Sequence, residues 1–136
     1  MKRFSGIFTP IATPFRDDDT LNEAALRSNV AKWMATSLTG LVVLGSNAEA
    51  ASLDDDEADR IVDIARQGVP KDRPLIAGTG RESTRATIAA TRRAAAAGVD
   101  AALVRTPSFF KPQMTSDASI AHRESRGATR RTPFRR

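Results

Sequence analysis

Apolar residues occur in short consecutive runs along this chain, and each run is followed by small residues and then by a longer stretch with helical periodicity. The clearest runs cover residues 41–44, 75–77 and 101–104. Because their apolar positions are consecutive rather than alternate, the strands that they predict would be covered on both faces. The pattern therefore predicts a parallel sheet flanked by helices.

With an N-terminal run at residues 6–8, strand starts fall near residues 7, 41, 75 and 101. Each strand and its return helix then take roughly 30 residues, as expected for a βαβ unit. A closed eight-unit barrel needs ~250 residues, whereas an open doubly wound sheet is complete with about five strands. The 136 residues therefore predict either a small open α/β domain or half a TIM barrel. A complete flavodoxin-like nucleotide domain would need a fifth strand.

Helical periodicity predicts helices over about 21–37, 54–67 and 83–97, with the start of a fourth at 114–118. For the first helix, Thr20 and Glu23 have the spacing of a capping box. Its buried face is predicted to carry four apolar residues. These are Leu26, Val30, Trp33 and Met34.

The second helix begins with acidic residues, which complement the positive end of the helix dipole. Its predicted buried stripe consists of Ala58, Ile61, Val62 and Ala65. Gly68 follows this helix and Gly98 follows the third, and glycine commonly terminates helices.

Composition is that of one soluble domain, with 40% hydrophobic and 27% charged residues. The chain has no cysteine, which excludes disulfides and thiolate metal sites. Pro10 and Pro14 interrupt the only stretch that could be read as a signal peptide, and no apolar run reaches the ~18 residues of a membrane span. These features predict a cytoplasmic protein without a membrane partner.

The positive net charge is confined to the end of the chain. Residues 1–118 carry 15 Lys or Arg and 15 Asp or Glu, whereas residues 119–136 carry six Arg and one Glu, which accounts for the net charge of +5. Residues 119–136 also lack helical or strand periodicity, and such a segment buries too little surface to offset its ordering entropy. We therefore expect a folded domain over 1–118 and a disordered, Arg-rich tail over 119–136.

Candidate site residues lie where parallel strands end, because ligands bind at the carboxyl ends of such strands. Gly45, Ser46 and Asn47 follow the second strand and offer backbone amides, a hydroxyl and a side-chain amide, which suit a carboxylate or phosphate. The alternative is a simple strand-to-helix turn. Residues 78–80 form a bare Gly-Thr-Gly, which is weak support for a nucleotide site. The pattern predicts no metal and no cofactor.

Three further residues have both a structural and a catalytic interpretation. Glu49 is expected to satisfy amides at a helix entry rather than to act as an acid or base. Lys111 could form a Schiff base if it were desolvated, but it lies in a loop between Phe110 and Pro112. His122, the only histidine, is expected to be a solvated tail residue.

Motifs at successive strand ends resemble those of the dihydrodipicolinate synthase / N-acetylneuraminate lyase family. The motifs stand at residues 6–10, 13–15, 45–49, 77–84 and 106–112. The resemblance implies the N-terminal half, about four βα units, of a TIM (β/α)8 barrel. Members are usually homotetramers that join a lysine to pyruvate or another 2-oxo acid as a Schiff base, and then make or break a carbon–carbon bond.

The resemblance assigns a substrate-binding role to Ser46 and Asn47, whose hydroxyl and backbone amides would hold the 2-oxo acid carboxylate. This pair most resembles the 4-hydroxy-2-oxoglutarate aldolase branch. Ala48 stands where the family usually has glycine, which would restrict the loop backbone. Phe109 stands where many members have a proton-relaying tyrosine, and phenylalanine cannot transfer that proton.

The family pattern is lost after Ala118, before the strands that carry the Schiff-base lysine and the main relay tyrosine. None of the four lysines matches the nucleophile position; they are Lys2, Lys32, Lys71 and Lys111. The sequence therefore predicts a lyase by resemblance, with no catalytic residue of its own and no turnover alone. The change at residue 119 is typical of an out-of-frame reading of a GC-rich gene.

Four strands would leave two unpaired sheet edges, which favours a homo-oligomer or aggregation. A different interpretation is a small α/β module that binds nucleic acid or an acidic partner through its arginine tail, with a steep salt dependence. The tail has few aromatic residues for stacking, so nucleic acid is the less favoured partner.

Overall fold

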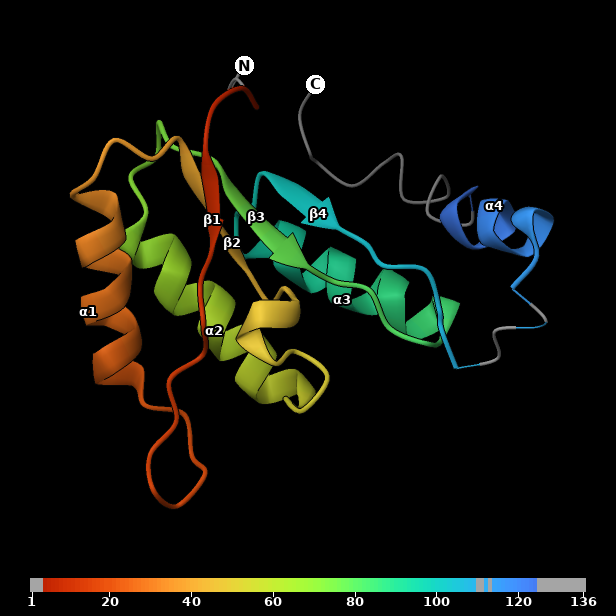
Figure 1. The fold of residues 1–136 in the computed structure, drawn as a ribbon, viewed down its shortest axis with the longest axis horizontal. Helices are drawn as coiled ribbons and strands as arrows, with labels where there is room; N and C mark the ends of the chain where they lie inside the picture. Colours follow the sequence, from red (N-terminus) through yellow and green to blue (C-terminus); the bar gives the residue numbers. More distant parts are fainter. Residues whose placement is uncertain (1–3, 110–111, 113, 125–136) are drawn as a thin grey trace.

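The computed structural model describes residues 4–109, 112 and 114–124. Four parallel strands form one sheet in the order β1-β2-β3-β4 (Figure 1). The strands are β1 Phe8–Pro10, β2 Gly40–Val43, β3 Leu75–Gly78 and β4 Ala101–Leu103. The helices are α1 Glu23–Met34, α2 Asp55–Gly68, α3 Thr84–Ala96 and α4 Ser116–Glu124, with a 3-10 helix, η1, at Ser46–Ala48.

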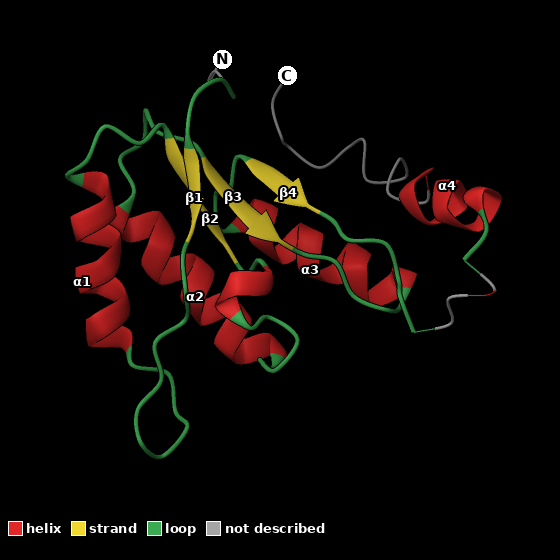
Figure 2. Cartoon of the chain, in the orientation of Figure 1, coloured by secondary structure: helices red, strands yellow, loops and turns green. Residues whose placement is uncertain are grey.

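The strand order decides between the alternatives that the pattern left open. Each strand pairs with the next strand along the chain, whereas a flavodoxin-like sheet reverses its order at a switch point. The helices that follow β1, β2 and β3 all contribute buried residues to one core cluster with the strands, so they cover the same face of the sheet. Figure 2 shows α1 to the left of the strands and α2 and α3 behind them. Consecutive units with helices on one face are the arrangement of successive units in a TIM barrel, as predicted.

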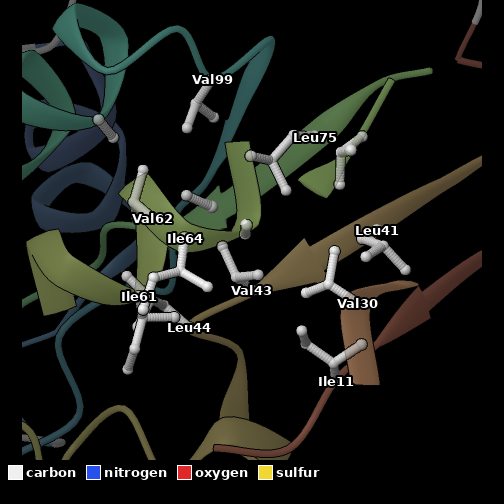
Figure 3. Packing of buried hydrophobic residues seen from close by; sticks show 14 of the residues in the cluster. Ile11, Val30, Leu41, Val43, Leu44, Ile61, Val62, Ile64, Leu75 and Val99 are labelled. Atoms are coloured by element: carbon white, nitrogen blue, oxygen red, sulfur yellow. The ribbon is translucent and has the colours of Figure 1, made fainter. Parts of the chain in front are cut away.

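The core lies between the sheet and these helices. Leu41 and Val43 of β2 and Leu75 of β3 are fully buried, and Figure 3 shows them beside Val30 of α1 and Ile61 of α2. The predicted stripe of α2 is confirmed, because all four of its residues are buried. One continuous cluster therefore fixes the strand ends against the helices.

The opposite face of the sheet has no helix among the described residues. Strand register places Pro10, Val42, Ile76 and Ala101 in one row on this face. Val42 and Ile76 are only half-buried, and Leu103, on the same face, is 54% exposed. The consecutive apolar runs thus correspond to strands with one face in the helix-covered core and the other face open in the described part of the chain.

The predicted capping box of the first helix is wrong. Asn22 is the N-cap, and its side chain accepts a hydrogen bond from the Ala25 amide. Thr20 instead bonds Asp18 in a tight turn, and Glu23 pairs with Arg60 of α2. The helix therefore starts later than expected, because a polar loop residue two positions on caps it. Trp33, expected in the core, is 42% exposed.

The second and third helices begin close to their predicted starts. Asp54 caps α2 in a full capping box with Glu57, and Ser83 caps α3 by accepting from the Ala86 amide. Gly98 follows α3 with a φ of +86°, a conformation that suits glycine. A polar residue at each of these starts thus caps the helix that follows.

The predicted disorder from residue 119 is wrong for the part that the structure describes. Helix α4 extends to Glu124, and Thr115 precedes it, with its hydroxyl oxygen accepting from the Ala118 amide. His122, expected in solvent, is buried, and its Nδ1 lies 2.8 Å from the Thr84 hydroxyl of α3. The contact of His122 with α3 is tertiary, so the composition of residues 119–136 could not predict it. Residues 125–136 lie outside the described residues.

Candidate functional site

A cavity of about 710 Å³ lies at the carboxyl ends of three neighbouring strands. Its wall comes from the loops after β2, β3 and β4, within residues 44–53, 78–82 and 103–105. This is the predicted location, because parallel α/β sheets bind ligands at that end. The volume falls in the range of small-molecule pockets.

Two glycines allow the three loops to approach each other. A Cβ atom on Gly78 would lie 1.8 Å from the Leu44 carbonyl oxygen, and one on Gly80 would lie 2.7 Å from the Arg105 amide nitrogen. Both nearest atoms belong to backbone, which cannot swing aside as a side chain can. The Gly-Thr-Gly segment is therefore explained by close packing of neighbouring strand ends.

The loop after β2 forms a tight turn that begins with two amides unused within the turn. Leu44 has a φ of +56°, the chain then turns through η1, and Glu49 follows with a φ of +53°. The Ala48 amide is the first to donate within this turn, to the Gly45 carbonyl. The amides of Ser46 and Asn47 precede it, so they have no partner within the turn.

A buried hydrogen bond fixes this turn from the opposite direction. The Thr13 hydroxyl, in the segment after β1, donates to the Ala48 carbonyl over 2.8 Å. Ala48 is itself buried, and it is not among the described non-glycine residues with positive φ. The expected restriction of the loop by Ala48 is therefore not seen, because its conformation is open to any L-residue.

Ser46, the first of the two predicted substrate-binding residues, lines the cavity. Asn47, also a described residue, is exposed beside it rather than part of the cavity wall. The Ser46 Oγ and Asn47 Oδ1 atoms are 3.4 Å apart. The hydroxyl of Ser46 and the neighbouring amides together offer donors to an anion.

On the far wall, a carboxylate clamps the loop after β4. Glu82 Oε2 accepts from the amides of Ser108 and Phe109 over 2.9 and 3.0 Å, and its Oε1 accepts from the Ser108 hydroxyl. Arg105 donates to the same hydroxyl over 2.8 Å and lies 3.4 Å from Glu82. Hydrogen bonds from the Phe109 and Ser108 amides hold the pKa of the Glu82 carboxyl below its ordinary value.

Sequence reasoning did not single out Arg81, Glu82 and Arg105, all of which line the cavity. Arg81 lies 3.4 Å from Asp55 at the start of α2, which ties the β3 loop to that helix. The sequence held only one indication that these residues line a site, which is that each is a charged residue shortly after the end of a strand. That signal is weak because exposed loops carry charges for many reasons.

The remaining residues considered from the sequence are Glu49, Thr79 and Lys111. Glu49 ends η1 and lines the cavity, whereas Asp54 caps α2, so the expected helix-entry role is wrong. Thr79 is buried, and its hydroxyl lies 2.8 Å from that of Thr91 in α3. Lys111 lies outside the described residues.

Among the residues that the structure describes, no group of three or more acidic, histidine or cysteine side chains is arranged to hold a metal ion. Within the same residues, no helix combines the length and apolarity needed to cross a membrane.

Comparison with known proteins shows which family has this fold and these loops. The sequence profile of the Dihydrodipicolinate synthetase family matches residues 3–120. The chain belongs to this family. The match spans all four strands, the cavity loops and the start of α4. The resemblance of the strand-end motifs is thereby confirmed at the level of the family.

Curated members of the dihydrodipicolinate synthetase family are similar over most of this chain. The 4-hydroxy-tetrahydrodipicolinate synthase of Methanothrix thermoacetophila is 42% identical over 109 residues, which cover 80% of this chain and 36% of that protein. The enzyme of the same name from Xanthomonas campestris is 44% identical over 118 residues, covering 87% and 38%. The chain thus spans less than half the length of these relatives.

Solved structures of family proteins confirm the fold. The 4-hydroxy-tetrahydrodipicolinate synthase of Methylacidiphilum fumariolicum superposes with a TM-score of 0.87 at 25% identity, over 96% of this chain and 43% of that one. YagE of E. coli, solved in complex with pyruvate, gives a TM-score of 0.81 at 30% identity, over 96% and 43%. The four units correspond to the N-terminal part of the family barrel.

Proposed function

We propose that the cavity holds the carboxylate of pyruvate or a related 2-oxo acid, as part of the site of a Schiff-base-forming lyase. Ser46 and Asn47 are the binding residues, through the Ser46 hydroxyl and the two amides at the start of η1. The finer assignment is to a site of the 4-hydroxy-2-oxoglutarate aldolase type, which rests on the Ser-Asn pair at this turn.

One observation carries the proposal: in a chain of this family, Ser46 lies on the wall of the cavity at the carboxyl ends of the strands. Two further features support it. The turn is braced by the Thr13 bond, so its donors are held in place before a ligand arrives. The relative YagE was solved with pyruvate, a ligand of this class.

The proposal also holds that the residues of this sequence bind the 2-oxo acid but do not form an imine with it. Covalent catalysis needs an amine held beside the bound carbonyl. Lys32 and Lys71 are exposed on the outside of the domain and do not line the cavity, and Lys2 and Lys111 lie outside the described residues. The carboxylate site alone would give weak binding, because it uses one end of the ligand.

Isothermal titration of the 136-residue chain with pyruvate tests the binding step. Ser46→Ala is expected to weaken pyruvate binding about tenfold, since a hydrogen bond to a charged group contributes about 1.5–3 kcal/mol. Ser28→Ala is the matched control, because Ser28 is exposed on α1 away from the cavity. Equal affinities of Ser46→Ala and the unchanged chain would refute the role of Ser46.

Treatment with pyruvate and borohydride tests the covalent step separately. Mass spectrometry is expected to find no lysine with a reduced pyruvate adduct. A stable adduct on any of the four lysines would show that this sequence supplies its own nucleophile.

A further inference from the structure

We infer that Thr87, which lies near the start of α3 and outside the cavity, is a positioning residue for the far wall of that cavity. Its hydroxyl contacts the two residues on either side of Glu82, and Glu82 in turn clamps the loop after β4. The inference rests on the proposed function, because it takes the cavity as a ligand site. The strand-end motifs of the sequence do not include Thr87.

Buried hydroxyls attach the loop after β3 to α3 at two points. Thr87 Oγ1 accepts from the Arg81 amide over 2.9 Å, and the carbonyl oxygens of Ser83 and Arg81 lie 3.1 and 3.2 Å from the same hydroxyl. Thr91 donates to the Thr87 carbonyl over 2.7 Å. Because a hydroxyl has one hydrogen, the 2.8 Å contact between Thr79 and Thr91 has Thr79 as its donor. Thr79 and Thr87 are both fully buried.

The contacts of Thr87 determine where Glu82 stands. Glu82 lies between Arg81 and Ser83, so the hydroxyl holds the backbone on both of its sides. Ser83 is also the N-cap of α3, so this stretch of backbone joins the helix directly. The Glu82 side chain is 45% exposed, which leaves little packing to fix it. The position of its carboxylate therefore follows from the backbone that carries it.

Glu82 passes this constraint on to the loop after β4. Its carboxylate accepts from the amides of Ser108 and Phe109 over 2.9 and 3.0 Å. Arg105 is the charged side chain that faces it, 3.4 Å away, and an ion pair between two exposed side chains contributes little. The far wall is thus held from α3 before a ligand arrives, which lowers the ordering cost of binding.

Two substitutions of Thr87 separate positioning from packing. Valine keeps the shape and the methyl group of threonine but has no hydroxyl, whereas serine keeps the hydroxyl and lacks the methyl group. Their helix propensities are similar. A role in packing alone makes Thr87→Ser the more damaging change, and a positioning role makes Thr87→Val the more damaging one. Ile64→Val is the control for a general loss of stability, because Ile64 is buried in the core and does not line the cavity.

Amide hydrogen exchange of the full chain is the first measurement. Thr87→Val is expected to lower the protection of the Ser108 and Phe109 amides at neutral pH about fivefold, as the loss of one hydrogen bond would. It is also expected to remove the dependence of that protection on the ionisation of Glu82. Thr87→Ser and Ile64→Val are expected to keep both the protection and its pH dependence.

Isothermal titration with pyruvate is the second measurement. Thr87→Val is expected to weaken pyruvate binding about threefold, while Thr87→Ser and Ile64→Val retain the affinity of the unchanged chain. Glu82→Ala removes the clamp at an exposed position and is expected to cause the same loss. The double variant is expected to lose no more than either single variant, because Thr87 acts through Glu82. Circular dichroism confirms that each variant is folded before its titration.

The outcomes separate the two proposals. Unchanged protection of Ser108 and Phe109 in Thr87→Val, or an equal loss in Thr87→Ser, overturns the positioning role. Pyruvate affinity that is unchanged in Glu82→Ala or in Thr87→Val overturns it as well, and each of these results leaves the carboxylate site intact. Absence of pyruvate binding to the unchanged chain overturns the proposed function and the use of Thr87 by that site, and the exchange data then show whether the contacts of Thr87 still hold the clamp.

Discussion

Gly78 offers the sharpest test of how the cavity is built, because a single methyl group there meets backbone. The Cβ of Gly78→Ala would lie 1.8 Å from the Leu44 carbonyl oxygen, whereas real Cβ contacts essentially never fall below 3.0 Å. One of the two strand ends must therefore move by at least about 1.2 Å. Overpacking of a fixed site typically costs about 1–3 kcal/mol, and contact with a backbone atom places this change at the upper end, about 2–3 kcal/mol.

Gly45→Ala is the matched control in the same region. Nothing lies within 4 Å of a Cβ atom at position 45, and Gly45 has a φ of −79°. The lower entropy of the unfolded chain favours alanine, while alanine is the poorer N-cap residue, so the two effects nearly cancel. The free energy of unfolding is expected to stay within about 0.5 kcal/mol of the unchanged chain.

Urea unfolding, followed by far-UV circular dichroism, measures both variants, and pyruvate titration gives a second readout. Because Leu44 leads directly into the turn with Ser46, Gly78→Ala should also weaken pyruvate binding, whereas Gly45→Ala should not distort that turn. A loss of less than about 0.5 kcal/mol for Gly78→Ala would refute the claim that the close approach is rigid.

Three other changes test separate contacts. Arg66→Met removes bonds from the half-buried guanidinium to the Val69 carbonyl and the Asp100 carboxylate, and should lower the free energy of unfolding by about 2–4 kcal/mol in urea, with an unchanged value refuting the contribution. Thr13→Val leaves the buried Ala48 carbonyl without its donor and should cost about 1–2 kcal/mol in the same assay, so a neutral result would show that this bond does not brace the turn. The lowered pKa of Glu82 means that its clamp contributes stability above the ordinary value of 4.5 and loses it as the pH falls through the folded-state pKa. Amide exchange at Ser108 and Phe109 should therefore be less protected at acidic pH, and Glu82→Gln should abolish that pH dependence; persistence of the dependence in the variant would assign it to another group.

Local signals predicted the elements well where one residue decides the structure. Gly98 ends α3 as expected because its φ is positive, and the acidic start of α2 became a capping box at Asp54. The first helix was harder, because Thr20 and Asn22 are both good caps and the choice depends on Asp18, which takes the Thr20 hydroxyl. When two neighbouring residues can both cap a helix, the spacing of residues in the sequence does not show which of them does so.

The sequence pointed to the turn after β2 and not to the charged residues on the opposite wall of the cavity. Ser46 follows a buried strand directly, so its place at the cavity follows from the strand end. Arg105 and Glu82 face each other only because two consecutive units are packed side by side, and their pairing spans 23 positions between 82 and 105. His122 was misplaced for the same reason, since its partner Thr84 lies on another helix.

The consecutive strand order also bears on how the protein is made. Each strand pairs with the one synthesised just before it, so the sheet can grow in the direction in which the ribosome releases the chain. A newly emerged strand therefore finds its docking edge already present and does not wait for distant segments. Each loop closure spans one βαβ unit, so its entropic cost is that of one crossover rather than of the whole chain.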